Sequence, residues 1–338
     1  MFKRLTTVMA GLASLGLACA LIAAPAAPAV AADKLTIATP GIPPIFSVMI
    51  VYIADKQGFF KKHGVEMQIR PFDNGTAAAR AVVAGDADMS WSPTPPVINQ
   101  VSNAGVPLVG IYGMPNPDWV IGTTEKGKTC KDIKGQEVGV DSVGGARSVA
   151  LRSMLAAGCP EVTIDDTKQV ALGGGAGTAM IAGRLQYGVL HLDDLAEIET
   201  QGKPLTILLR QSETNPTSHY LILVARKDNL EKKRAAFVNA VAAMIEAAHF
   251  MQDPKNADAV AEAATVTGHP AAVNKAALKQ FLDMKFWAIN DDGMPRKKIE
   301  AVATLMKKIG GITADKEPVP FDQFVDGTVW KDANAAVK

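Results

Sequence analysis

Apolar positions follow two different periods along residues 34–112 and predict strands and helices in turn. Short apolar runs at Lys34–Thr39 and Val65–Arg70 are typical of strands, whereas Phe46–His63 has the apolar spacing of a helix that stops before Gly64. The pattern continues with a helix from Asn74 through Val83 and short strands at Ala87–Trp91 and Pro107–Tyr112. Strands that alternate with helices are typical of an α/β fold with a parallel sheet.

The same order of elements begins again in the next part of the chain, with a strand at Glu137–Asp141. Ala81–Ser90 aligns with Ala179–Gly188 at an offset of 98 residues, and the offset also places Gly75 on Gly173. An internal repeat of this kind indicates two similar structural units. We therefore predict two Rossmann-like lobes with a central cleft, into which the carboxyl ends of the strands face.

Two segments are expected to cross between the lobes, near Pro117–Thr123 and Pro216–Tyr220. These hinge crossings assign residues 33–119 to the first part of lobe I and residues 120–218 to lobe II. Residues 219–338 then return to lobe I and are predicted to be largely helical.

Residues 1–32 have the pattern of a cleavable secretory signal peptide. Lys3 and Arg4 form a basic start, Leu5–Ala24 is apolar, and small residues precede Asp33. A transmembrane anchor is the alternative, but the Ala- and Gly-rich run ends in small residues and prolines. A lipoprotein signal would use Cys19, although the residues before it match a lipobox poorly. We expect export to the periplasm.

Charge gives no argument for a nucleic-acid or membrane partner. The signal peptide holds two of the 35 basic residues and none of the 34 acidic ones, so the exported chain has a net charge of −1. A basic surface is the usual mark of binding to nucleic acid or anionic lipid. About 306 residues remain after cleavage, enough for two lobes of ordinary size.

Export leaves two cysteines, Cys130 and Cys159. In an oxidising compartment such a pair is most simply a disulfide, with two free buried thiols as the alternative. Cys130 precedes the strand at Val138–Val140 and Cys159 follows the next helix, so they meet if that helix packs back on the strand. Neither Cys-x-x-Cys nor His-Glu-x-x-His occurs, and neither a metal nor another cofactor is expected.

The Gly-rich turns do not match the motifs of phosphate-binding enzymes or hydrolases. Gly145 and Ala146 stand where a P-loop has Lys and Ser/Thr, and Thr178 stands at the third glycine position of a dinucleotide fingerprint. Ser142 lacks the first glycine of a nucleophile elbow. These turns offer backbone N–H groups and small side chains, and no catalytic set is predicted.

The candidate ligand-binding residues lie at the turns where strands lead into helices. N–H groups at the helix start around Ser142–Ala146 favour an anion, although ordinary capping by Ser142 is the alternative. Trp91 is expected either to stack on the solute or to pack in the core. The full set is Pro43, Gly75, Thr76, Trp91, Ser92, Tyr112, Ser142, Gly144, Gly145, Ala146, Gly174, His191 and Asp193.

Several charged side chains near these turns have two alternative roles. His191 can donate a hydrogen bond to a carboxylate or sulfonate, or it is structural. Arg147 can hold an anion with two hydrogen bonds, but it equally fits a place in solvent on the first helical turn. Asp118 and Asp141 would instead suit an amine or amide on the solute.

Several ordered segments resemble periplasmic solute-binding proteins of ABC importers. The resemblance covers the exported chain and is strongest to the nitrate-, sulfonate- and taurine-binding group, which shares its fold with thiamine-pyrimidine synthases. The segments are LTIATPGIPP, IADKQGFFKKHGVEMQIRPFDNGTAAARAVVAGDADMSW, AGVPLVGIY, CKDIKGQEVGVDSVGG and DQFVDGTVW. The resemblance implies a hinged clamshell of the type II periplasmic binding proteins, a monomer that hands its solute to a membrane permease with an ATPase partner.

Two departures limit what the resemblance carries over. His191 stands where a small residue is common in the group, so no ligand identity transfers. The cysteine cluster of the synthases is absent, so their chemistry does not transfer either. We therefore predict a binding protein without enzyme activity, which takes up a small organic solute and favours an anion such as a sulfonate or carboxylate. The alternatives are an exported enzyme with His191 and Asp193 as acid–base groups, or a sensor coupled to a membrane receptor.

Overall fold

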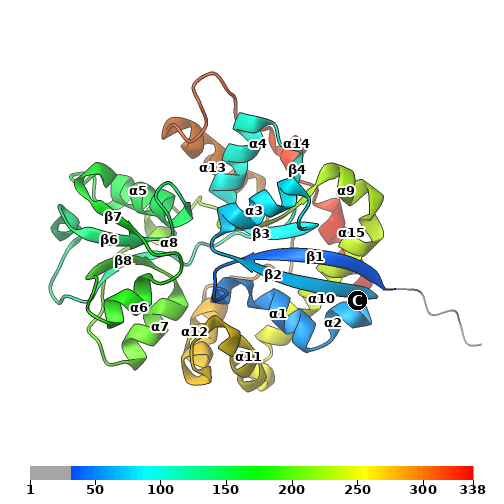
Figure 1. Cartoon of the computed structure of the whole chain (residues 1–338), viewed down its shortest axis with the longest axis horizontal. Helices are drawn as coiled ribbons and strands as arrows, with labels where there is room; N and C mark the ends of the chain where they lie inside the picture. The colour runs from blue at the N-terminus through cyan, green and yellow to red at the C-terminus, as the bar shows by residue number, and fades with distance from the viewer. Residues whose placement is uncertain (1–31, 338) are drawn as a thin grey trace, which may run out of the picture. The chain divides into compact units, whose positions relative to one another are not determined.

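The computed structural model describes residues 32–337, which form two α/β lobes (Figure 1). The predicted signal peptide, apart from its last residue, lies outside the described residues. Within residues 32–337, every helix is too short or too polar to traverse a lipid bilayer.

Lobe I is built on a five-stranded sheet in the order β2-β1-β3-β10-β4. β1 pairs in parallel with β2 and β3, whereas β10 is antiparallel to both β3 and β4. The strands are β1 (Asp33–Pro40), β2 (Val65–Phe72), β3 (Met89–Pro93), β4 (Leu108–Met114) and β10 (Leu221–Arg226).

Lobe II repeats this arrangement in the order β7-β6-β8-β5-β9. β6 pairs in parallel with β7 and β8, and β5 is antiparallel to β8 and β9. The strands are β5 (Val120–Thr123), β6 (Glu137–Val140), β7 (Lys168–Ala171), β8 (Tyr187–Leu190) and β9 (Thr206–Arg210). The predicted pair of α/β lobes is confirmed, but both sheets are mixed rather than wholly parallel.

The internal repeat found in the sequence corresponds to equivalent positions in the two sheets. Met89 begins β3 beside Ile37 of β1, and Tyr187, 98 residues later, begins β8 beside Val138 of β6. The helix before each strand ends at a glycine of positive φ, Gly85 in lobe I and Gly183 in lobe II. A residue with a side chain is strained in that conformation, which explains why both copies keep the Ala-Gly pair.

Helices cover both faces of each sheet, in the layered architecture that parallel strands require. The helices of lobe I before the first crossing are α1 (Met49–Lys56), α2 (Phe59–Lys62), α3 (Gly75–Ala84) and α4 (Thr94–Ala104), with the 3₁₀ turn η1 (Phe46–Val48). Those of lobe II are α5 (Ala146–Gly158), α6 (Ala176–Ile181), α7 (Leu192–Thr200) and α8 (Gln211–Thr214), with the turns η2 (Cys130–Ile133) and η3 (Ile164–Asp166). The predicted helix at Phe46–His63 is interrupted, because Gly58 has a φ of 74°.

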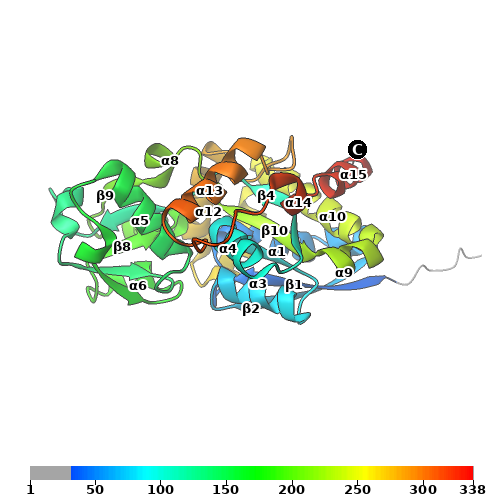
Figure 2. The same ribbon diagram turned by 90° about the horizontal axis from the view of Figure 1, so that it is seen from above.

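The return segment begins with β10, an interior strand of the lobe I sheet, and is largely helical after it, as predicted. Its helices are α9 (Lys227–Lys232), α10 (Arg234–Gln252), α11 (Ala257–Ala263), α12 (Ala271–Asp283), α13 (Arg296–Lys308), α14 (Phe321–Phe324) and α15 (Thr328–Val337), with the turns η4 (Pro254–Asn256) and η5 (Ala264–Thr267). α15 lies beside α10 (Figure 2) and buries Val329 and Trp330.

A disulfide joins Cys130 to Cys159, with Cα atoms 6.1 Å apart. Cys130 begins η2 just before β6, and Cys159 caps the end of α5. The bond therefore ties the start of β6 to the far end of the helix that packs back over the lobe, the arrangement expected from the order of elements.

The chain passes between the sheets through two short segments. β4 of lobe I ends at Met114 and β5 of lobe II begins at Val120, while β9 ends at Arg210 and β10 begins at Leu221. Trp119 and Tyr220 stand at the ends of these segments, and their rings pack edge to face with centroids 4.7 Å apart. Tyr220 also contacts Phe286, so an apolar cluster continues from the crossings into lobe I.

Candidate functional site

The strand-to-helix turns of both lobes enclose a cavity of about 560 Å³. Lobe I contributes Ile42–Ile45, Asp73 and Asn74, and lobe II contributes the turns after β6, β7 and β8. Thr267 and His269 of the return segment complete the wall. A smaller cavity shares part of this lining and extends it to Trp119 and Tyr220 at the two crossings. We call the two together the cleft.

Six of the predicted ligand-binding residues line the cleft and seven do not. The six are Pro43, Gly75, Ala146, Gly174, His191 and Asp193. The seven are Thr76, Trp91, Ser92, Tyr112, Ser142, Gly144 and Gly145. The turns were therefore located more reliably than the individual side chains.

Trp91, Ser92 and Tyr112 belong to the core of lobe I, which corrects their assignment to the cleft. The rings of Trp91 and Tyr112 pack with centroids 5.4 Å apart, and both residues are fully buried. The Tyr112 hydroxyl donates to the carbonyl oxygen of Ala288, and the Ser92 hydroxyl is 2.9 Å from that of Ser90. β3 and β4 are buried on both faces, so their side chains point into the packed layers.

The helix start expected to bind an anion is occupied by the protein's own carboxylate. Asp141 Oδ1 accepts hydrogen bonds from the backbone N–H of Ser142 at 2.8 Å and of Arg147 at 3.1 Å. Its Oδ2 accepts from the N–H of Ala146 at 3.1 Å. A carboxylate at this place satisfies free N–H groups and the helix dipole, as a bound anion would.

His191 is held by hydrogen bonds on both ring nitrogens. The indole N–H of Trp119 donates to Nε2 at 3.1 Å, so Nε2 has no proton of its own. Nδ1 therefore carries the proton and donates to Asp118 Oδ2 at 2.9 Å. Neither nitrogen is left to donate to a solute or to exchange a proton with one, and His191 instead links the first crossing to the start of α7.

Arg147 is buried at the cleft and does not extend into solvent. Its Nη1 donates to the carbonyl oxygen of Val189 at 2.8 Å and lies 3.6 Å from Asp194 Oδ2. Within the part of the chain that the structure describes, its Nε and Nη2 make no hydrogen bond to protein. These groups can donate to an acceptor on a solute.

Asp193 and His269 join the two lobes. Sequence reasoning identified Asp193 as a candidate but missed His269. Asp193 Oδ2 accepts from the Phe46 N–H of lobe I at 3.4 Å and lies 3.7 Å from His269 Nε2. His269 Nδ1 is 3.2 Å from Glu197 Oε2 of α7. His269 precedes α12, the helix beside α7 in Figure 1. We call these contacts the latch.

The latch favours a charged histidine. Burial alone would lower the pKa of His269, but its hydrogen bond to Asp193 and the charges of Asp193, Glu197 and Asp194 raise the pKa to about 9. Burial would likewise raise the pKa of Asp193, and the His269 contact holds that pKa below its ordinary value. At neutral pH the latch is therefore an ion pair between the lobes.

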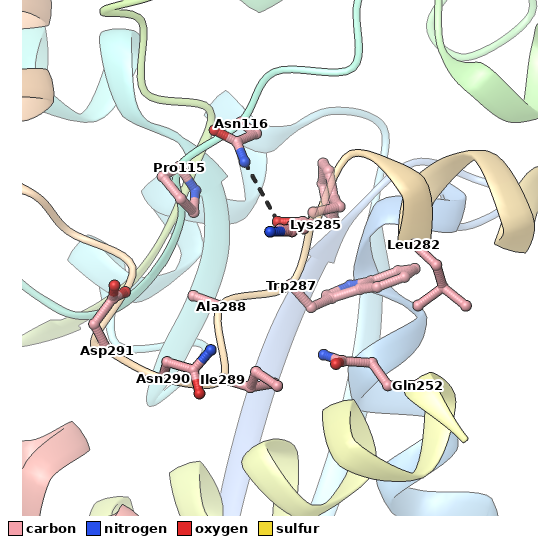
Figure 3. Close-up of a pocket in the computed structure, with 11 residues that line it drawn as sticks. Pro115, Asn116, Gln252, Leu282, Lys285, Trp287, Ala288, Ile289, Asn290 and Asp291 are labelled. Carbon is pink, nitrogen blue, oxygen red and sulfur yellow. Dashed lines mark hydrogen bonds between the residues drawn. The ribbon is translucent and has the colours of Figure 1, made fainter. Parts of the chain in front are cut away.

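A second cavity of about 540 Å³ lies in lobe I behind the first crossing (Figure 3). It is lined by Pro115 and Asn116 and by the segment that follows α12. The Asn116 amide donates to the carbonyl oxygens of Met284 at 3.2 Å and Lys285 at 3.3 Å, which fastens the crossing to that segment. No residue of lobe II lines this cavity, so it is separate from the cleft.

The described residues of the cleft do not form a metal site. Among residues 32–337, no group of three His, Cys, Asp or Glu side chains is placed to hold a metal ion. His191 and His269 are both bonded to carboxylates of the protein.

Residues 45–257 match the model of the NMT1/THI5-like family. The chain belongs to this family. Proteins of Brucella abortus and Brucella suis that are named as binding proteins are 28% identical to this family member over 141 residues. The match covers 42% of this chain and 43% of theirs, so it spans less than half of the relatives' length.

Solved structures extend the likeness over the whole fold. A protein of Bordetella bronchiseptica has a TM-score of 0.74 and 22% identity, with 90% of this chain and 98% of that chain covered. The nitrate-binding protein NrtA of Synechocystis scores 0.72 at 14% identity, covering 93% and 90%. The aliphatic sulphonate-binding protein SsuA of Escherichia coli scores 0.65 at 19% identity, covering 86% and 91%. At these identities the comparison shows the periplasmic-binding-protein fold alone.

Replacement of Gly75 by alanine tests the packing at the edge of the cleft. A Cβ at Gly75 would overlap the ring of Pro93, whereas a Cβ at Gly174 meets no atom within 4 Å. We expect Gly75→Ala to lower the free energy of unfolding by about 1–3 kcal/mol through overpacking. Gly174→Ala, the matched control, should change it little. Denaturant unfolding measures both, and equal effects would contradict the packing argument.

The latch predicts a pH-dependent contribution of His269. A pKa of about 9 lies above the ordinary histidine value, so the stabilisation is complete below about pH 6.5 and is lost as the pH rises through 9. After allowance for solvent screening we expect about 1–2 kcal/mol. The measurement is the unfolding free energy of wild type minus that of His269→Gln between pH 6 and 10. A difference that does not change with pH contradicts the ion pair.

Proposed function

We propose that this protein is the extracytoplasmic solute-binding component of an ABC importer. It captures a small organic solute in the cleft and delivers it to a membrane permease whose ATPase partner drives transport. The predicted signal peptide would place it in the periplasm. The observation that carries the proposal is the cleft itself, since its walls come from two lobes joined by only two short crossings. Family membership and the named binding proteins of similar fold support it.

Closure by rotation of the lobes follows from the same geometry. The backbone ladders keep each lobe rigid, so movement is concentrated at residues 115–119 and 211–220. The latch forms only when α7 and the turn at His269 approach, and it therefore adds to the closed state. A solute that contacts both walls shifts the population toward closure, because it binds the closed state more tightly than the open one.

The enzyme alternative has less support. His191 would have to exchange a proton, yet both of its ring nitrogens are bonded within the protein. Asp193 is engaged by the Phe46 N–H and by His269. The preference for an organic anion is not part of this proposal either, because Asp141 occupies the helix start on which that preference depended.

A thermal-shift panel on residues 33–338, stripped of bound solute, tests solute binding. The panel holds sulfonates, aromatic acids, nitrate, amino acids, amines and pyrimidines. A solute at about 1,000 times its dissociation constant should stabilise the protein by roughly 4 kcal/mol. A hit within one chemical class, with compaction in X-ray scattering, supports capture by closure. Turnover of a compound without solute stabilisation would instead favour the enzyme.

Exposed apolar side chains around the cleft offer a contact for the permease. In the described part of the chain, the exposed large apolar residues are Ile42 at 60%, Val143 at 68% and Val266 at 45%. Ile42 lines the cleft from lobe I, Val143 lies in the turn of lobe II beside it, and Val266 precedes Thr267 of its wall. A partner that contacts apolar residues on both lobes at once can distinguish the closed state from the open one.

Substitution of these residues should separate binding from delivery. We expect Val143→Glu to leave solute affinity within about twofold and to reduce uptake at least tenfold, because it places a desolvated charge in the contact. Ala335→Glu on α15, an exposed site distant from the cleft, is the control. The readout is uptake of the solute by cells in which each variant replaces the native gene. Full uptake with Val143→Glu would argue against docking here and indicate that the permease contacts another surface of the protein.

A further inference from the structure

Side-chain oxygens of the protein already accept backbone N–H groups at three of the helix starts around the cleft, those of α5, α7 and α3. Asp141 caps α5, and Asp194 Oδ2 accepts from the His191 N–H before α7 at 2.9 Å. In lobe I, Asn74 Oδ1 accepts from the Ala77 N–H of α3 at 3.0 Å. To bind at one of these starts, an incoming sulfonate or nitrate would have to displace these oxygens, two of which belong to carboxyl groups. At these three starts, acceptors stand where the fold otherwise offers donors.

The formal charges of the cleft lining also disfavour an anion. The lining of the cleft holds four carboxylates and two cations, an excess of two negative charges. The carboxylates are Asp73, Asp141, Asp193 and Asp194, and the cations are Arg147 and protonated His269. Burial raises the pKa of Asp194, yet even a neutral Asp194 leaves one negative charge in excess.

Each cation of the lining is paired with a carboxylate, whereas one carboxylate oxygen of the cleft has no partner among the described residues. Arg147 and His269 both lie against carboxylates of the protein. Asp193 Oδ1 is buried and has no hydrogen-bond partner among the described residues, although Asp193 lines the cleft. Asp73, from the other lobe, is exposed at the cleft. A buried acceptor without a donor is unfavourable, and a solute N–H group that bonds to it would remove that free-energy cost.

The remaining wall suits the body of such a solute. Trp119 and Tyr220, both almost fully buried, border the smaller cavity of the cleft, and Ile45 and Leu172 add apolar surface from the two lobes. Aromatic faces attract positive charge as well as rings. The free N–H groups of Arg147 fit one acceptor atom on the solute.

We propose that the solute is a small nitrogen-bearing organic molecule that donates hydrogen bonds, is neutral or positively charged overall, and carries an apolar or ring-shaped body. Nitrate and simple sulfonates are excluded from the cleft. This proposal rests on the proposed function, because it names the class of solute that the binding protein takes up. Asp73 and Asp193 receive the donor groups from opposite walls, and Arg147 orients the molecule.

Pairs of probes that differ in one charged group test the solute class. Titration calorimetry compares benzylamine with phenylmethanesulfonate and benzamidine with benzoate, with nitrate alone as a further probe. We expect the nitrogen member of each pair to bind at least tenfold more tightly. Tighter binding of the acidic members overturns the inference and leaves the proposed function intact. If neither member of any pair binds and the thermal-shift panel is also flat, the proposed function itself fails.

A charge-neutral substitution on lobe I locates the effect in the cleft. Asp73 makes no hydrogen bond within the described part of the chain, so Asp73→Asn should leave the fold unchanged. We expect it to weaken binding of the nitrogen probe about tenfold, the usual effect of losing a charge-assisted hydrogen bond. Asp86→Asn, at the opposite end of α3, removes the same charge away from the cleft and should change nothing. Equal affinities for the two variants overturn the role of the cleft carboxylates.

Discussion

Each lobe depends on hydrogen bonds to a strand that arrives directly from the other lobe. β5 follows the first crossing and lies between β8 and β9, and β10 follows the second and lies between β3 and β4. Both are paired on each side by antiparallel ladders. Each crossing thus runs from the edge strand of one sheet, β4 or β9, to an interior strand of the other sheet, β5 or β10. The hinge can bend only over the few residues between those ladders, and the position of the cleft follows from that restriction.

Carboxylates then determine what the cleft presents. The turns after parallel strands expose N–H groups at helix starts, a feature the fold has before any side chain is considered. In this chain Asp141 and Asp194 satisfy several of those groups. The same residues orient Arg147 through its backbone N–H and its guanidinium. Capping therefore stabilises the helices and places carboxyl groups at the cleft at the same time.

The sequence predicted those features that repeat or depend on local conformation. The Ala-Gly pairs located Gly85 and Gly183 in equivalent turns, because only glycine adopts their positive φ without strain. β5, β9 and β10 were harder to recognise, since a short antiparallel strand is stabilised by partners far away in sequence.

The directions of the side chains were predicted least well from the sequence. Trp91 stands two residues before Pro93, which lines the cleft, yet β3 is buried on both faces and directs its indole into the core. His269 gave no local signal, because its partners Asp193 and Glu197 are contributed by the other lobe.

The likeness to nitrate- and sulphonate-binding structures therefore concerns the scaffold more than the solute. A shared fold fixes where a ligand sits, while the chemistry of the site is set by the side chains that line it. Asp141 illustrates the difference, because its carboxylate already accepts N–H groups that a helix start would otherwise offer to an anion. His191 adds a second difference. It sits at the cleft but is bonded to Asp118 and Trp119, so it holds the crossing in place and contributes no free donor. Solute selection in this fold can thus change through residues that cap and brace the scaffold, without any change in the sheets that carry it.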